Sequence, residues 1–236
     1  MRTAILIIGH IRTWSECKDN FIEAFGHLNP DVFVSTYNLQ FNYHPAQQGW
    51  MGGQSDTILS GDDIISLFDG INLIGIDVED ISEVLAEYNV IKSDLNPKFN
   101  DETNTYLQYK KIKRAIEMLK MYEEQCGFKY DNIIKIRADI HHNKFEYEID
   151  DKSVIISDGN VFPNDVIFGM TRDNFIKLSD FFISEFHNPV YADSHLKAPH
   201  NLLLRGFEHI GVGILEKNIM KYVVRKIGKH YYNNIR

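Results

Sequence analysis

Short apolar runs alternate along the chain with longer segments in which apolar residues recur every three or four positions. Runs of five to seven apolar and β-branched residues predict buried strands, whereas the three-to-four spacing predicts amphipathic helices. We expect strands at 4–8, 31–37, 71–76, 132–136, 153–157 and 165–170. The segment 220–227 is expected to form a last strand or a short helix.

The helical pattern is strongest at 105–127, where apolar positions follow helical spacing and Gly127 stands where a helix would end. Ser60, followed by Asp63 three positions later, predicts a capping box at the start of a short helix. Pro199 is suited to the first turn of another helix. The expected helices cover 17–28, 60–70, 105–127, 171–186 and 199–218.

Strands that alternate with helices predict an α/β sandwich around a mainly parallel sheet. In such sheets ligands collect at the carboxyl ends of the strands. Polar segments at 38–59, 92–105 and 187–199 read as loops, and the first and last of these are the expected determinants of specificity. The strand ends to inspect are 9–12, 37–38, 137–142 and 164–170.

Composition narrows the function classes. The 236 residues are 44% hydrophobic, enough for one large domain or two small ones. A net charge of −8 without a basic stripe disfavours binding to nucleic acid or to anionic membranes. Cys17 and Cys126 fit neither a disulfide framework nor a zinc pattern, which indicates a reducing compartment. The apolar run 4–8 is too short for a signal peptide or a transmembrane segment.

The sharpest candidate for chemistry is "RADIHH", directly after the strand 132–136. Asp139 at a strand end can offer oxygen ligands to Mg²⁺ or Mn²⁺. His141, two positions on, would point to the same side if the strand continued. The alternative is that Arg137 and Asp139 form a surface ion pair, with His141 and His142 as ordinary edge residues.

Two further segments carry weaker signals. In "GHIRT", Gly9 permits close backbone approach and Arg12 can bind a diphosphate bidentately, although a tight turn with a surface arginine explains the same letters. In "PNDVIFGM", Asn164 and Asp165 precede a strand, where a carboxylate can act as a general base. Turn chemistry explains that pair equally well. We find no zinc-hydrolase spacing, no G-x-S-x-G and no glycine-rich phosphate loop.

The order of these segments resembles a family of GT-A-type glycosyltransferases found in bacterial surface-polysaccharide clusters and large DNA viruses. The likeness rests on "GHIRTW", "PDVFVSTYN", "YDNIIKIRADI" and "NDVIFGMTRDNF" and extends over roughly residues 4–225. It implies a single GT-A-like, Rossmann-like α/β/α sandwich with a mainly parallel mixed sheet. The nucleotide-binding half would span about 1–140 and the acceptor half about 141–236, in a cytoplasmic enzyme of polysaccharide biosynthesis.

The resemblance also implies roles for individual residues. Asp139 would correspond to the last aspartate of a D-x-D motif and, with His141, hold Mn²⁺ or Mg²⁺. Arg137 stands where the first aspartate is usual, and an arginine there can itself neutralise phosphates. The other implied contacts to the nucleotide sugar are Gly9, His10, Arg12, Tyr37, Asn38, Gln108, Lys111, Arg114 and Asn164. A solvated helix face is the alternative for the three residues between 108 and 114.

The implied reaction transfers a sugar from a UDP-linked or similar donor to a glycan or other hydroxyl acceptor. An inverting enzyme needs a base, for which Asp165 is the candidate, while a retaining enzyme needs none there; the sequence does not decide between them, nor does it give the oligomeric state. Two other readings stay open. One is a Mg²⁺-dependent nucleotidyltransferase or phosphohydrolase using Asp139 and Asp165. The other is a non-catalytic nucleotide-sugar-binding domain, which Arg137 in the motif favours.

Overall fold

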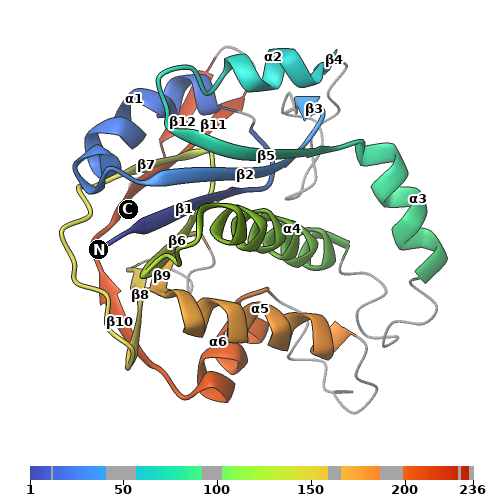
Figure 1. Ribbon diagram of the computed structural model, residues 1–236. Coiled ribbons are helices and arrows are strands. Elements are labelled where there is room, and N and C mark those ends of the chain that lie inside the picture. Colours follow the sequence, from blue (N-terminus) through green and yellow to red (C-terminus); the bar gives the residue numbers. More distant parts are fainter. Residues whose placement is uncertain are drawn as a thin grey trace.

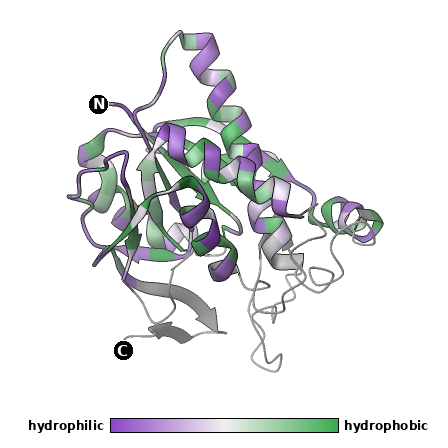
Figure 2. Ribbon diagram, turned by 90° about the horizontal axis from the view of Figure 1, so that it is seen from below, coloured by the Kyte–Doolittle hydropathy of each residue, from purple (hydrophilic) through white to green (hydrophobic). Residues whose placement is uncertain are grey.

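The computed structural model describes residues 1–11, 13–40, 57–91, 103–158, 166–186, 199–227 and 230–233. A twisted central sheet lies between two layers of helices, as Figure 1 shows. Hydrophobic residues concentrate in the strands, while the helices alternate hydrophobic and hydrophilic positions (Figure 2). This distribution follows from the sequence pattern, since each helix has only one face to bury.

The central sheet has seven strands in the order β10-β8-β9-β6-β1-β2-β5. All of them run parallel except β9, which is antiparallel to both neighbours. The predicted α/β/α sandwich with a mainly parallel mixed sheet is therefore confirmed. Its strands are β1 (Thr3–Ile8), β2 (Asp31–Tyr37), β5 (Leu73–Glu79), β6 (Asn132–Ile136), β8 (Ser153–Ser157), β9 (Phe168–Thr171) and β10 (Gly213–Lys217).

Helices cover both faces, so the inner strands are buried on both sides and need apolar residues throughout. Every residue of β1 and β6 is buried. The helices α1 (Trp14–Phe25) and α2 (Gly61–Ser66) lie over one face, and α4 (Thr103–Cys126), α5 (Arg172–Phe186) and α6 (Pro199–Ile210) over the other (Figure 1). The sheet therefore separates two hydrophobic cores, one under each helical layer.

Smaller elements complete the description. A 3₁₀ turn at Gly26–Leu28 follows α1, and α3 (Ile81–Ile91) follows β5. A second sheet has the order β12-β11-β7, and a two-stranded pair joins β3 to β4. Their bounds are β3 (Leu39–Gln40), β4 (Thr57–Ile58), β7 (Ile140–His142), β11 (Met220–Ile227) and β12 (His230–Asn233). None of the helices in the described ranges is long and apolar enough to cross a membrane.

Three local predictions from the sequence can be compared with the structure: the capping box at Ser60, the segment 220–227 and the helix 199–218. The Ser60 hydroxyl accepts from the Asp63 amide at 3.1 Å and the Asp63 carboxylate accepts from the Ser60 amide at 3.2 Å, so the capping box is confirmed. The strand at 220–227 is confirmed over the short helix. The helix predicted at 199–218 is wrong beyond Ile210, because Gly211 turns the chain with φ +73° and the next segment forms β10.

Candidate active site

The order of the strands reverses at one position of the sheet. From β1 the chain proceeds outward through β2 to β5, and then α4 returns it to β6 on the other side of β1. At such a topological switch point the connections diverge from the carboxyl ends of two adjacent parallel strands, and ligands bind in the crevice between them. At this switch point β1 and β6 pair side by side, and their carboxyl ends continue into the turn at Gly9–Ile11 and the turn at Arg137–Asp139.

The turn after β1 brings backbone close to this crevice. Gly9 has φ +95°, a conformation that side-chain-bearing residues rarely adopt, and its amide donates to the Ser35 carbonyl of β2 at 3.0 Å. His10 follows with its ring 5.2 Å from the Tyr37 ring. Gly9 thus allows the chain to leave the sheet sharply. Arg12 lies outside the described residues.

The turn after β6 holds an arginine–carboxylate pair. Asp139 Oδ1 accepts from Arg137 Nε at 2.9 Å and Asp139 Oδ2 from Arg137 Nη2 at 2.5 Å. The Asp139 side chain is 3% exposed, whereas that of Arg137 is 27% exposed. Arg137 and Asp139 therefore form the ion pair that was considered as the alternative. The carboxylate of this pair is buried, however, and does not lie at the surface.

The strand β6 does not continue through Asp139. The condition under which His141 would point to the same side as Asp139 is therefore not met. β6 ends at Ile136, and β7 begins at Ile140 in the second sheet, paired with β11. The His141 ring instead bonds through Nε2 to the Glu16 carbonyl of α1 at 3.1 Å. The turn therefore separates His141 from Asp139 as partners for one ion.

A divalent metal does not fit the residues described here. No group of three or more His, Cys, Asp or Glu side chains that can hold a metal ion occurs among them. Both Asp139 oxygens already accept from Arg137. A dication about 5 Å from the guanidinium would be repelled by roughly 7 kcal/mol at an effective dielectric constant of about 20. Asn164 and Asp165 lie outside the described residues.

A second charged cluster lies at the same edge, between β5 and α4. Asp77 and Glu79 project from β5 beside Ser35 and Tyr37 of β2. Their carboxylates meet three cations of α4, and the Ser35 hydroxyl donates to Asp77 at 2.9 Å. We call this the β5–α4 cluster: Ser35, Asp77, Glu79, Lys110, Lys111 and Arg114.

Lys111 is the centre of the β5–α4 cluster and is fully buried. Its Nζ lies 2.7 Å from Glu79 Oε2, 3.2 Å from Asp77 Oδ2 and 4.4 Å from the centre of the Tyr37 ring. Burial lowers the pKa of Lys111, and the two carboxylates oppose that shift. The solvated helix face given as the alternative for Lys111 is wrong, because the side chain is fully buried.

The neighbouring α4 candidates are more exposed. Arg114 is 45% exposed, with Nη2 3.4 Å from Asp77 Oδ1 and 3.9 Å from Glu79 Oε1. Gln108 is half-buried. Lys110, which the sequence did not single out, pairs with Glu79 at 3.3 Å and with Glu87 at 2.5 Å. Lys110 and Arg114 therefore already pair with carboxylates of β5, and Lys110 also with a carboxylate of α3.

Sequence reasoning missed Asp77 and Glu79, because it ended the strand at 76. The signal was present in "DVE", where charged residues alternate with Val78 and so face one side of a strand.

Tyr37 and Asn38 hold the ends of β2 and β5 in place. Tyr37 is buried, and its hydroxyl donates to the Leu107 carbonyl at 3.2 Å; burial, with Glu79 and Asp77 nearby, raises its pKa. The Asn38 amide donates to Asp80 at 2.8 Å and accepts from the Ile81 amide at 3.2 Å. Asp80 in turn accepts from Ser82, and these hydrogen bonds, the Ser82 hydroxyl first, lower its pKa to about 2.

β7 is fixed to α1 directly after the Arg137–Asp139 turn. The Asn20 side chain bonds the His142 backbone twice, accepting from its amide at 2.5 Å and donating to its carbonyl at 3.1 Å. The His142 ring is buried against Phe25, and neither ring nitrogen has a hydrogen-bond partner among the described residues. Burial, followed by the charge of His141, lowers the pKa of His142 to about 3.

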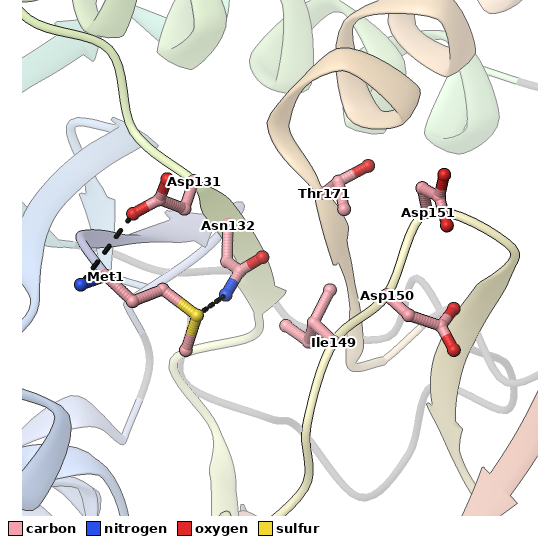
Figure 3. A pocket seen from close by; sticks show the side chains of 7 residues that line it. All are labelled: Met1, Asp131, Asn132, Ile149, Asp150, Asp151 and Thr171. Atoms are coloured by element: carbon pink, nitrogen blue, oxygen red, sulfur yellow. Dashed lines mark hydrogen bonds and ion pairs between the residues drawn. The ribbon is translucent and has the colours of Figure 1, made fainter.

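The opposite edge of the sheet carries an open depression of about 580 Å³ (Figure 3). It lies at the amino ends of the strands, away from the switch point, and three of its lining side chains are carboxylates. Asp131 accepts from the Arg2 amide and Asp150 from the Lys152 amide and the Ser153 hydroxyl, so both act as backbone or turn caps. An acidic depression of this kind would repel a phosphate.

Comparisons with known proteins assign no function to this chain. No protein-family model matches the sequence, and no curated protein sequence matches it either. Among 101 matching chains of solved structures is the galactosyltransferase LgtC, in complex with donor and acceptor sugar analogs. That match has a TM-score of 0.44 and 10% identity, and covers 90% of this chain and 72% of the other. At this distance it supports no statement about the substrate or mechanism of this chain.

Proposed function

We propose that the protein is a glycosyltransferase that uses a nucleoside-diphosphate sugar, UDP-linked, and transfers the sugar to a hydroxyl of a glycan or other acceptor. One observation carries the proposal: at the carboxyl ends of the paired strands β1 and β6, the turn after β1 begins with Gly9 at positive φ, and the turn after β6 holds Arg137 in a two-point pairing with Asp139. Backbone without a side chain can approach a bound diphosphate closely, and a fixed guanidinium can neutralise its charge.

The chemistry would be displacement at the anomeric carbon, with the nucleoside diphosphate as the leaving group. Negative charge develops on that diphosphate as the glycosidic bond breaks, and a cation fixed in advance stabilises the transition state more than one that must reorganise. Arg137 would supply this charge. Asp165 keeps its proposed role as the base of an inverting reaction, and the segments 38–59 and 187–199 remain the proposed acceptor determinants.

The reading as a Mg²⁺-dependent phosphohydrolase or nucleotidyltransferase is less well supported. That chemistry needs a carboxylate that offers an oxygen to the metal, whereas both oxygens of Asp139 accept hydrogen bonds from Arg137. A non-catalytic nucleotide-sugar-binding domain would use the same crevice. Turnover distinguishes it from the proposed enzyme.

Thermal unfolding in the presence of UDP-, GDP- and dTDP-sugars tests the proposal. A ligand that binds the native state at about 100 times its Kd adds roughly 2.7 kcal/mol, or about 5–10 °C in Tm for a chain of this size. We expect one nucleotide series to produce such a shift and the corresponding nucleoside, without phosphates, to produce little. Release of free nucleoside diphosphate upon addition of hydroxyl acceptors would identify transfer.

No shift with any of the three series would contradict the proposal. A shift without release of nucleoside diphosphate, over a broad set of saccharide acceptors, would instead support the non-catalytic binding domain.

A further inference from the structure

We propose that Asp139 is a positioning residue for Arg137, and that the Arg137 guanidinium, rather than a divalent cation held by Asp139, neutralises the donor diphosphate. This inference rests on the proposed function and specifies how its site handles charge. It reverses the role that the D-x-D resemblance implies for Asp139, which would there be a metal ligand.

The geometry of the pair fixes the guanidinium. Asp139 engages Arg137 through Nε and Nη2, two nitrogens on one edge of the guanidinium, so both the plane and the direction of the group are determined. A single contact would leave the plane free to rotate. The two bonds therefore place the rest of a rigid fork relative to the end of β6, where the switch-point crevice begins.

Asp139 is more buried than Arg137, as expected if Asp139 positions the arginine and the arginine contacts the ligand. Asp139 is almost completely buried in the turn, whereas more than a quarter of the Arg137 side chain reaches solvent. A carboxylate that bound a metal for an incoming diphosphate would have to present its oxygens toward the crevice. Here the oxygens face the guanidinium, and the guanidinium is the more exposed group.

Replacing the pair by a metal site would be costly. The metal would have to displace two charge-assisted hydrogen bonds and then sit beside the displaced cation. His141, the second ligand that the resemblance implies, bonds to the backbone of α1 instead. Within the described ranges, no other set of side chains is arranged to share the ion.

The chain contains a matched pair for comparison. Lys144 and Glu146 have the same spacing as Arg137 and Asp139 and an N–O distance of 2.5 Å, but both side chains are more than half exposed. Because solvent screens such a pair, it holds neither partner in one orientation. Lys144→Gln is therefore the control for any general effect of removing one cation from an i, i+2 ion pair.

The first test measures the affinity for UDP, GDP and dTDP by calorimetry, in EDTA and again in Mn²⁺ or Mg²⁺. We expect the nucleotide that binds to do so with a Kd that changes by less than about twofold between the two conditions. Loss of binding in EDTA, with recovery in Mn²⁺ or Mg²⁺, would overturn the inference while leaving the proposed function intact. Absence of binding in every condition would instead refute the proposed function, and the inference with it.

The second test separates positioning from direct ligation by a double-mutant cycle in EDTA. Arg137→Gln should weaken nucleotide binding roughly 10- to 100-fold, because a hydrogen-bonded contact to a charged group is lost. Asp139→Asn alone should weaken it by about tenfold. In the Arg137→Gln background, adding Asp139→Asn should change the Kd by less than about twofold, because there is no guanidinium left to orient.

An Asp139→Asn effect of equal size with and without Arg137 would contradict positioning. The unliganded Tm of each variant and of Lys144→Gln shows whether the fold is retained. If Asp139→Asn alone does not fold, the Arg137→Lys variant carries the test: it keeps the charge but loses the side-on pairing, and should bind nucleotide clearly more weakly than the wild type. Binding at the wild-type level by Arg137→Lys would refute the role of the oriented fork.

Discussion

Two charged clusters lie at the same edge of the sheet and differ in what covers them. The β5–α4 cluster is packed under a helix, and its central Lys111 has no solvent exposure. The Arg137–Asp139 pair lies at the β1–β6 switch point, where the arginine keeps part of its surface in solvent. Both look alike in sequence, as charges following an apolar strand.

The comparison shows that charge at a strand end does not by itself make a ligand site. In the β5–α4 cluster each carboxylate meets cations of α4, so the charges attach the helix to the sheet. In the Arg137–Asp139 pair one buried carboxylate holds one cation that keeps part of its surface in solvent. The first arrangement should therefore govern stability, and the second should govern binding.

The largest expected effect is the loss of Lys111. Lys111→Met should lower the free energy of unfolding by about 2–4 kcal/mol, because it leaves the carboxylates of Asp77 and Glu79 short of a buried partner. Urea unfolding measures the change. Nucleotide affinity of the folded variant should remain within a few-fold of the wild-type value.

Lys113→Ala is the matched control on the same helix. Lys113 is half exposed and lies 3.9 Å from Glu117 in an i, i+4 pair, so its loss should change stability by less than about 0.5 kcal/mol. Equal effects of the Lys111 and Lys113 substitutions would contradict the assignment of the β5–α4 cluster to stability.

The second expected effect is a loss of folding stability at low pH, caused by His142 in β7, directly after the Arg137–Asp139 turn. His142 is neutral in the fold down to about pH 3 but binds a proton near pH 6.5 when unfolded. Between these values the unfolded chain holds more protons, so stability falls as pH falls, by at most about 1.4 kcal/mol per pH unit. From pH 6.5 to 5 the loss should be roughly 1–2 kcal/mol, because at pH 6.5 only half of the unfolded chains carry the proton.

His142→Leu should remove this contribution, because a leucine of similar size fills the site without a titrating group. Urea unfolding at pH 7 and pH 5 should show a smaller difference for the variant than for the wild type. Asp139 and His141, the charged neighbours that act on His142, are retained in the variant. An unchanged pH dependence would show that His142 does not titrate as stated.

The sequence was sufficient for most strands of the central sheet and for its helical layers, but not for β10, for the end of β5 or for the site. Runs such as Asp31–Tyr37 and Ser153–Ser157 match the structure because period and composition are local properties. The residue at which a strand ends, and the elements that pack over that end, depend on residues distant in the sequence. Whether Lys111 is buried depends on β5 continuing to Glu79, and whether Asp139 faces a metal or an arginine depends on a turn that ends β6 at Ile136.

The smallest structural perturbation is chemical labelling of the two thiols. Cys126 is exposed, whereas Cys17 is buried in α1 and burial raises the pKa of its thiol to about 12. With DTNB at pH 8, one thiol should react quickly and the other only upon unfolding. Fast reaction of both would show that α1 opens readily and would contradict the buried position of Cys17.

Hydrogen–deuterium exchange with and without a saturating nucleotide sugar tests the central claim most directly, since it locates the ligand. The account predicts slower exchange in peptides covering residues 9–11 and 137–141 upon binding, with little change at 77–81 or at 149–152. Protection at the depression lined by Asp150 and Asp151, or at the β5–α4 cluster without protection at Gly9 and Arg137, would contradict a donor site at the β1–β6 switch point.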